Sequence, residues 1–405
     1  MDQVETNART AANKTGPRIL VVDDNDDNRY TLTLYLELEG YSDVVVAHDG
    51  EQAIERLKAD AFDLVLLDVM MPKVDGYQVL AWAAKQPQLS DLPIIMISAL
   101  NEIDSVVRCV ELGAVDYLLK PFNPVLLKAR LGATLEKKRL RDEVKAHLAR
   151  LRAELDAARK LQLAMVPQAF PPPSADFPVD LFAMMEPARE VGGDLYDFFP
   201  TADGRLCFLI GDVSGKGMPA ALFMARTKSL IRIATELMRG PDGGPPGAAD
   251  IIGRVNRELS QSNPDMMFVT MFFALLAPKT GEIEFCNAGH NAPYRLKGGE
   301  VAPIEAARGV ILGVRPNAAH VAGRLTLTPD ETIYLFTDGV TEAINAAAEL
   351  FSEERLEAVL RAANGKTSAA LVDAVASELR VFVGAAEAFD DITMLALRPT
   401  DVTAG

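Results

Sequence analysis

Cysteine, histidine and long apolar stretches are all scarce in this chain. Its 405 residues include four histidines and three cysteines, Cys109, Cys207 and Cys286. So few and so scattered thiols exclude a disulfide framework and a cysteine-based zinc site, and they favour a reducing compartment. The most apolar run covers only residues 266–277. This is well short of the roughly 20 residues that a membrane-spanning helix needs.

A surplus of positive charge is missing as well. Lysine and arginine number 41 against 57 aspartates and glutamates, a formal net charge of −16. An acidic protein repels phosphate-rich partners, which excludes a general nucleic-acid-binding or anionic-membrane-binding role. Residues 1–16 are polar, lack the apolar segment of a signal peptide, and are expected to form a disordered leader. We therefore expect a cytoplasmic protein.

Residues 17–128 alternate between short apolar runs and helical patterns. The runs include RILVVDD from Arg18, DLVLLD up to Asp68, and IIMIS up to Ser98. Continuous apolar strands that alternate with helices predict an α/β domain with a doubly wound parallel sheet covered on both faces. Ligands of such sheets gather at the carboxyl ends of the strands.

Residues 129–168 are predicted to form a helical linker. The segment has no glycine after Gly132 and is dense in charge. Its apolar residues recur at steps of three and four, which is a helical and partly heptad spacing. A single apolar stripe needs a partner, so we expect a homodimeric coiled coil; the alternative is a lone helix lying against one domain. The stripe consists of Leu140, Val144, Leu148, Leu151, Leu155 and Ala158.

Residues 169–400 are predicted to form a second domain. The helix-breaking sequence PPPS opens it at Pro171. Short apolar strands follow in clusters, with helical segments expected near residues 219–238, 248–261 and 352–383. Clustered strands with grouped helices predict an α+β fold built on a β-sandwich.

Acidic side chains end two strands of the predicted first domain. Asp23 and Asp24 follow the first strand and Asp68 ends the third, while Ser98 and Lys120 end the next two. In a parallel sheet these groups meet at one edge, where three carboxylates require a cation, and oxygen ligands suit Mg²⁺. A hydroxyl and an ammonium beside them predict a phosphoryl site with Asp68 as acceptor. The alternative is that all five are ordinary turn residues, which their shared register disfavours.

The motifs VVDD, LLDVMMPKVDG, ISA and KP resemble those of response-regulator receiver domains. The resemblance implies that Asp68 accepts phosphate from a histidine kinase, with Ser98 and Lys120 contacting the phosphoryl oxygens. It also implies a switch role for Tyr117; the alternative is a half-buried strand tyrosine. The implied Mg²⁺ ligands are Asp23, Asp24, Asp68 and the carbonyl of Met70.

A second set of aspartates follows apolar runs and precedes tight turns in the second domain. Its members are Asp194, Asp212, Asp338, Asp390 and Asp391. Each one alone fits a turn or a helix cap. Together at strand ends they predict a carboxylate site for hard cations, Mg²⁺ or Mn²⁺ in preference to zinc. A two-metal site of this kind is suited to the hydrolysis of phosphoesters.

Long motifs of the second domain resemble, in order, the bacterial stress-response and sporulation branch of the metal-dependent (type 2C, PPM) protein phosphatases. They are AARKLQLAMVPQ, VGGDLYDFF, GDVSGKGMPAALFMA, NAGHNAPY, TDGVTEA and DDITML. The resemblance implies hydrolysis of phosphoserine or phosphothreonine with two Mn²⁺ or Mg²⁺ ions. The phosphate-gripping arginine of the eukaryotic enzymes has no clear counterpart. The implied ligands are Asp194, Asp212, Asp338, Asp390 and the Val213 carbonyl, with Asp391 either a ligand or a support for its neighbour.

Both resemblances together predict a two-component output enzyme in which phosphorylation of Asp68 controls the phosphatase. The family resemblance implies a phosphorylated anti-sigma-factor antagonist as the substrate. His290 fits either a general acid or, as we favour, a hydrogen-bonded loop residue. A non-catalytic adaptor is one alternative, but a binding scaffold has no need of clustered carboxylates. A transcription factor is another, but no recognition-helix or basic output domain is visible.

Overall fold

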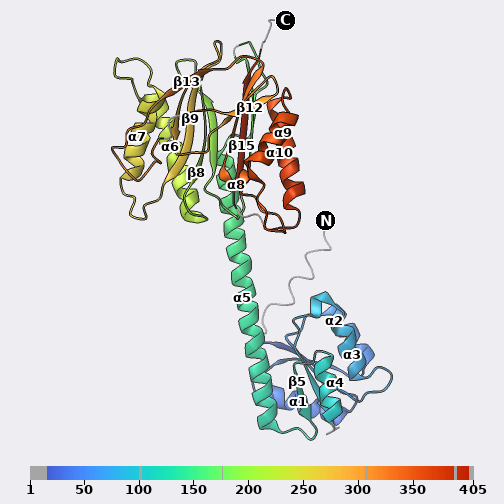
Figure 1. Ribbon diagram of the computed structural model, residues 1–405. Coiled ribbons are helices and arrows are strands. Elements are labelled where there is room, and N and C mark those ends of the chain that lie inside the picture. The colour runs from blue at the N-terminus through green and yellow to red at the C-terminus, as the bar shows by residue number, and fades with distance from the viewer. Residues whose placement is uncertain (1–15, 100–102, 176, 306–308, 387–389, 401–405) are drawn as a thin grey trace, which may run out of the picture. The chain divides into compact units, whose positions relative to one another are not determined.

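The computed structural model describes residues 16–99, 103–175, 177–305, 309–386 and 390–400 (Figure 1). The chain divides into two compact units, residues 1–151 and 152–405. Of the leader predicted at residues 1–16, all but Gly16 lies outside the described residues. Within the described ranges, no helix combines the length and the apolar character that a membrane crossing requires.

The first unit contains a parallel five-stranded sheet with the strand order β2-β1-β3-β4-β5. All neighbouring pairs are parallel. The order reverses between β1 and β3, which is where doubly wound sheets bind their ligands. This confirms the predicted α/β class. The strands are β1 (Arg18–Val22), β2 (Asp43–Ala47), β3 (Leu64–Asp68), β4 (Ile94–Ser98) and β5 (Asp116–Leu119).

Helices cover both faces of this sheet. Successive strand side chains point to opposite faces, and two separate apolar cores result. One core includes side chains of α1 and of the start of α5, and the other includes side chains of α2, α3 and α4. The helices, with one short 3₁₀ turn η1 (Pro87–Leu89), are α1 (Asp26–Leu38), α2 (Gly50–Ala59), α3 (Gly76–Ala83), α4 (Ile103–Glu111) and α5 (Pro124–Met165).

Helix α5 is continuous from Pro124 to Met165. Its start is capped by Asn123, whose side-chain oxygen accepts the amide hydrogens of Val125 and Leu126. The first turns are anchored in the first unit by the buried Leu127 and Leu131. Further along, four apolar side chains of the predicted stripe are about half exposed. They are Leu140, Val144, Leu148 and Leu151.

The second unit contains two antiparallel five-stranded sheets, in the orders β13-β10-β9-β8-β7 and β12-β11-β14-β15-β6. One apolar core joins the inner faces of both sheets. The strands are β6 (Val179–Glu186), β7 (Leu195–Pro200), β8 (Leu206–Val213), β9 (Val269–Ala277), β10 (Glu282–Ala288), β11 (Tyr294–Lys297), β12 (Glu300–Pro303), β13 (Gly323–Thr326), β14 (Glu331–Phe336) and β15 (Ile392–Pro399).

Helices pack on the outer face of each sheet of this sandwich. One outer core joins β8 and β9 to α6 and α7, and another joins β14 and β15 to α8, α9 and α10. This confirms the predicted sandwich with grouped helices. The helical pattern predicted near residues 352–383 is two helices, because the chain turns at Gly365 with φ of 82°. The helices are α6 (Met218–Leu237), α7 (Ala248–Ser260), α8 (Asp338–Thr341), α9 (Ser352–Ala362) and α10 (Ser368–Val383).

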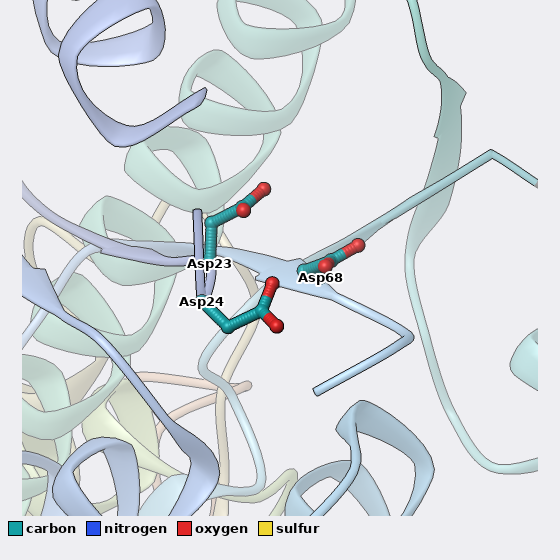
Figure 2. A group of neighbouring side chains, drawn as sticks. All are labelled: Asp23, Asp24 and Asp68. Atoms are coloured by element: carbon teal, nitrogen blue, oxygen red, sulfur yellow. The ribbon is translucent and has the colours of Figure 1, made fainter. Parts of the chain in front are cut away.

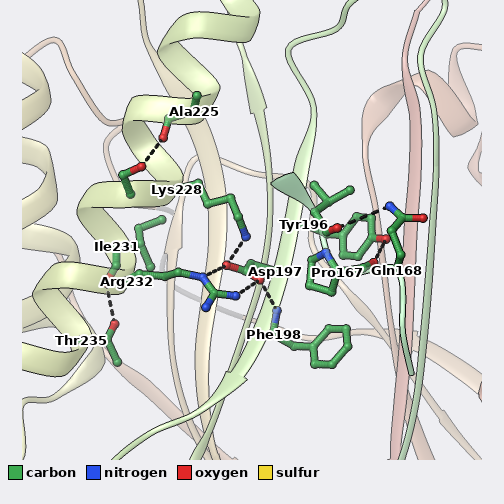
Figure 3. A network of polar contacts seen from close by, with 12 residues as sticks. Pro167, Gln168, Tyr196, Asp197, Phe198, Ala225, Lys228, Ile231, Arg232 and Thr235 are labelled. Atoms are coloured by element: carbon green, nitrogen blue, oxygen red, sulfur yellow. Dashed lines mark hydrogen bonds and ion pairs between the residues drawn. The ribbon is translucent and has the colours of Figure 1, made fainter. Parts of the chain in front are cut away.

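A buried ion cluster fixes α6 against β7 (Figure 3). The carboxylate of Asp197, on β7, is 1% exposed and pairs with Lys228 of α6. It also accepts two hydrogen bonds from Arg232, at 2.7 and 2.8 Å, and one from the backbone of Phe198. Burial lowers the pKa of Lys228 despite this pairing. The cluster holds in place the strand that follows Asp194 directly.

Candidate functional site

Three carboxylates meet at the carboxyl edge of the parallel sheet. Figure 2 shows Asp23, Asp24 and Asp68 side by side at the ends of β1 and β3. One oxygen from each lies within 4.8 Å of one oxygen of the others. Asp23 and Asp68 are buried and Asp24 is exposed. The residues come together because β1 and β3 are neighbours, so that their last residues share one edge.

Lys120 contributes a positive charge to this edge. Its ammonium lies 2.8 Å from Asp23 and 2.9 Å from Asp68. Burial raises the pKa of Asp68 to about 6, and the neighbouring anions Asp23 and Asp24 add to the rise, while Lys120 opposes it. Burial lowers the pKa of Lys120, but the two carboxylates outweigh it and the net shift is upward. Anions held at this density fit a divalent cation with oxygen ligands.

The other predicted residues of the first site lie around the same edge. Ser98 is buried at the end of β4, and its carbonyl oxygen accepts the amide hydrogen of Lys120 at 2.8 Å. Tyr117 is half-buried on β5. The side chain of Met70 is 61% exposed.

The predicted aspartates of the second unit come from both sheets of the sandwich. Asp194 directly precedes β7 and is 2% exposed, and Asp212 lies near the end of β8. Asp338 is the first residue of α8, two residues after β14, and Asp390 lies two residues before β15. The described residues contain one group of three or more acidic, histidine or cysteine ligand atoms that all lie within 4.8 Å, the one in the first unit. No three carboxylates of the second set therefore have oxygens that all lie within 4.8 Å of one another.

Asp391 holds the loop that carries Asp194. Its two oxygens accept the amide hydrogens of Ala188, at 2.8 Å, and of Gly193, at 2.7 Å. A Cβ atom on Gly192 would lie 2.0 Å from the same carboxylate, so only glycine permits this approach. These contacts commit both carboxylate oxygens of Asp391 to backbone amides of the segment before Asp194.

Further polar contacts order the second cluster. The hydroxyl of Thr337 donates to Asp194 at 2.8 Å. The ammonium of Lys216 lies 2.8 Å from Asp390. A Cβ on Gly193 would lie 2.7 Å from the carbonyl oxygen of Val213, so this glycine lets the two segments meet. Thr337 was not among the predicted residues, although it directly precedes Asp338 in the TDG motif.

Three carboxylates of the second cluster have raised pKa values. Burial raises the pKa of Asp194 well above its usual range, and Asp212 and Asp391 add to the rise. Burial and the charges of Asp338 and Asp390 raise the pKa of Asp212 to about 7. Burial and Asp390 also raise the pKa of Asp338. Buried carboxylates that repel one another are stabilised by a divalent cation, so this donor set fits Mg²⁺ or Mn²⁺.

The end of α5 contacts the Asp194 loop directly. Gln162 is 4% exposed. Its amide donates to the carbonyl of Gly192 at 2.6 Å, and its oxygen accepts the amide hydrogen of Gly192 at 3.0 Å. The hydroxyl of Tyr196 donates to the carbonyl of Pro167, just beyond the helix, at 2.5 Å. The prediction missed Gln162; the available signal was a polar residue in the otherwise apolar LQLAM segment.

Comparison with known proteins agrees with this architecture of a parallel α/β unit and an antiparallel sandwich. Residues 19–132 match the family model of the response regulator receiver domain, and residues 202–400 match that of Stage II sporulation protein E (SpoIIE). Asp194 lies just before the second matched segment. The chain therefore carries a segment similar to response regulator receiver domains, followed by one similar to SpoIIE.

Individual relatives match parts of the chain. Protein IcfG of Synechocystis sp. is 31% identical over 268 residues, which are 61% of this chain and 41% of that protein. The probable transcriptional regulator ycf27 of Porphyridium aerugineum is 44% identical over 120 residues, which are 30% of this chain and 48% of that protein. The chain thus spans less than half of the length of each relative.

The fold of the second unit is that of a PP2C domain. The structure of the SiaA-PP2C domain of Pseudomonas aeruginosa superposes with a TM-score of 0.54 at 22% identity, covering 62% of this chain and 98% of that one.

Proposed function

We propose that this protein is a metal-dependent protein serine/threonine phosphatase controlled by phosphorylation of its receiver domain. The observation that carries the proposal is the set of buried and half-buried, mutually repelling carboxylates near the strand ends of both sheets. Burial and like charges raise the pKa values of Asp194, Asp212 and Asp338. Such a set is costly to a folded protein unless a cation binds it.

The residues proposed to hold two Mn²⁺ or Mg²⁺ ions are Asp194, Asp212, Asp338, Asp390 and the carbonyl of Val213. Bound ions would activate water and neutralise charge on the phosphoryl oxygens. In the reaction, water oxygen bonds to phosphorus, the bond from phosphorus to the serine oxygen breaks, and that oxygen takes up a proton. Asp391 positions the Asp194 loop through its bonds to Ala188 and Gly193.

In the receiver, Asp68 is the proposed phosphoacceptor. Its carboxylate oxygen bonds to the phosphorus of a phosphohistidine on a histidine kinase, the phosphorus–nitrogen bond breaks, and the freed imidazole is protonated. Mg²⁺ held by Asp23, Asp24, Asp68 and the Met70 carbonyl would neutralise the added charge. Lys120 already lies 2.9 Å from Asp68 and is placed to contact a phosphoryl oxygen. Ser98 and Tyr117 are the proposed hydroxyl contact and switch residue.

Helix α5 is the proposed path between the two sites. Its first turns are packed in the core of the receiver through Leu127 and Leu131. Near its other end, Gln162 holds both backbone groups of Gly192, two residues before Asp194. A rotation or shift of the helix would move Gly192 and so assemble or dismantle the metal site.

A second copy of the chain is the proposed partner of α5. Leu140, Val144, Leu148 and Leu151 are 49–57% exposed on one helical stripe. Pairing two such stripes in a coiled coil would remove them from water. Sedimentation equilibrium should give the mass of a dimer; a monomer at micromolar concentration would contradict this part of the proposal.

The proposed substrate is a phosphorylated anti-sigma-factor antagonist, on the strength of the SpoIIE-type domain. The test is release of phosphate from a phosphoserine protein of this class and from p-nitrophenyl phosphate, each with and without Mn²⁺. We expect hydrolysis to require Mn²⁺ and to be lost in Asp338→Asn, but to persist in the exposed-loop control Asp242→Asn. Full activity in Asp338→Asn would refute the metal assignment, and no hydrolysis by the wild type would favour a non-catalytic adaptor.

A further inference from the structure

The imidazole of His290, between β10 and β11, uses both of its nitrogens inside the sandwich. His290 is 3% exposed. Its Nε2 lies 3.1 Å from the carbonyl oxygen of Phe336, and its Nδ1 lies 2.9 Å from the hydroxyl of Thr270. Because a carbonyl oxygen only accepts, Nε2 carries the proton and Nδ1 accepts from Thr270. Neither nitrogen is left to act as a general acid.

The two partners of this ring belong to different sheets. Thr270 lies on β9 and is paired with Asp212 of β8 in the first sheet. The hydroxyl of Thr270 also lies 3.5 Å from the carbonyl oxygen of Asp212. Phe336 is the last residue of β14 in the second sheet, two residues before Asp338. The ring therefore joins the strand ends that carry two of the proposed metal ligands.

The backbone of His290 is fixed independently of its ring. Asn287, which is 2% exposed, accepts the amide hydrogen of His290 at 2.8 Å and donates to its carbonyl oxygen at 3.0 Å. A backbone bridge joins the preceding Gly289 to Met271 of β9. The backbone of the NAGH sequence thus holds the imidazole in a fixed place.

We propose that His290 is a positioning residue of the carboxylate site, whose ring sets the spacing between Asp212 and Asp338. The inference rests on the proposed function, because it assigns a purpose to that spacing. The ring is a rigid spacer that donates to one sheet and accepts from the other. Burial lowers the pKa of His290 to about 4, so the ring keeps this neutral form at pH 7.

The test is the affinity of the full chain for Mn²⁺, measured by titration calorimetry. Asp23→Asn and Asp24→Asn are present throughout, so that binding reports the second unit. His290→Leu fills the site but loses both hydrogen bonds, and we expect it to weaken Mn²⁺ binding about 10–100-fold, as for other groups that orient metal ligands. His290→Gln carries a donor and an acceptor on one planar group, and we expect binding within a few-fold of the parent.

Two threonine variants keep the test decisive if His290→Leu does not fold. Thr270→Val removes only the bond on the β9 side, and we expect a several-fold weaker Mn²⁺ affinity. The matched control Thr235→Val removes a buried hydroxyl that donates within α6, to Ile231, and we expect unchanged affinity.

Each of the following results would overturn either the positioning role of His290 or the proposed function. Unchanged Mn²⁺ affinity in His290→Leu, or in Thr270→Val where His290→Leu does not fold, would overturn the positioning role. Equal weakening in His290→Leu and His290→Gln would also overturn it, because the hydrogen bonds would then not be the cause. A parent protein that binds no Mn²⁺ would instead contradict the proposed function itself.

Discussion

Gln162→Ala tests whether α5 holds the loop that carries Asp194. The side chain is 4% exposed and makes two hydrogen bonds to Gly192, at 2.6 and 3.0 Å. Truncation removes both bonds and leaves the amide hydrogen and the carbonyl oxygen of Gly192 without these partners in a buried place. At about 1–1.5 kcal/mol for each bond, we expect the free energy of unfolding to fall by about 2–3 kcal/mol.

The same change should act on the proposed metal site. Gly192 lies two residues before Asp194, whose loop is otherwise held by Asp391 and Thr337. Loss of a group that orients a ligand typically lowers metal affinity or activity about 10–100-fold. We therefore expect Mn²⁺-dependent hydrolysis of p-nitrophenyl phosphate to fall by at least tenfold, and higher Mn²⁺ to restore part of it.

The assay compares Gln162→Ala with Gln168→Ala as a matched control. Gln168 is exposed, and its amide donates to carbonyl oxygens at the end of α5 itself. We expect the control to keep the wild-type rate and thermal midpoint. If Gln162→Ala kept the wild-type rate and Mn²⁺ dependence, a role for this contact in ordering the Asp194 loop would be refuted, even if the variant were less stable.

Two further predictions concern the stability of the second unit. Asp197→Ala leaves the buried Lys228 without its counter-charge, and we expect the free energy of unfolding, measured in urea, to fall by about 3–5 kcal/mol. Because burial lowers the pKa of Lys228, the variant should regain stability as the pH rises toward 10. A loss that does not depend on pH would contradict this. The Glu331 carboxylate is fully buried, yet Lys297, the Thr328 amide and Arg295 outweigh burial and lower its pKa to about 2. The stabilisation by Glu331 is present above pH 4.5 and is lost as the pH falls toward 2. Glu331→Gln should lower the free energy of unfolding by on the order of 2 kcal/mol at pH 7 and flatten the fall of the melting temperature at acid pH. An unchanged fall of the melting temperature at acid pH would refute the assignment.

The parts of the fold with a strong local pattern could be predicted from the sequence. In the first unit, each strand is a short apolar run that ends in a polar turn, and the parallel α/β class follows from that alternation. In the sandwich, the long apolar strands β8, β9 and β15 were equally clear. The strands β7, β11 and β12 carry a weaker signal, since they are short and mix polar or aromatic residues with apolar ones.

The candidate sites were predictable in composition but not in detail. Strand-end aspartates stand out because polar residues follow apolar runs. The contacts of Asp391, Gln162 and His290 depend instead on segments far apart in the chain, such as Gly193 and Asp391, which are 198 residues apart. No local pattern records such a pairing, so the supporting role of these residues required the three-dimensional structure.

The coupling of receiver and phosphatase is the central claim, and one comparison tests it most directly. The Mn²⁺-dependent rate of p-nitrophenyl phosphate hydrolysis is measured for the full chain with and without acetyl phosphate, in the wild type and in Asp68→Asn. The account predicts that acetyl phosphate changes the rate of the wild type and leaves Asp68→Asn unaffected. An active enzyme whose rate is the same with and without acetyl phosphate in both proteins would contradict it.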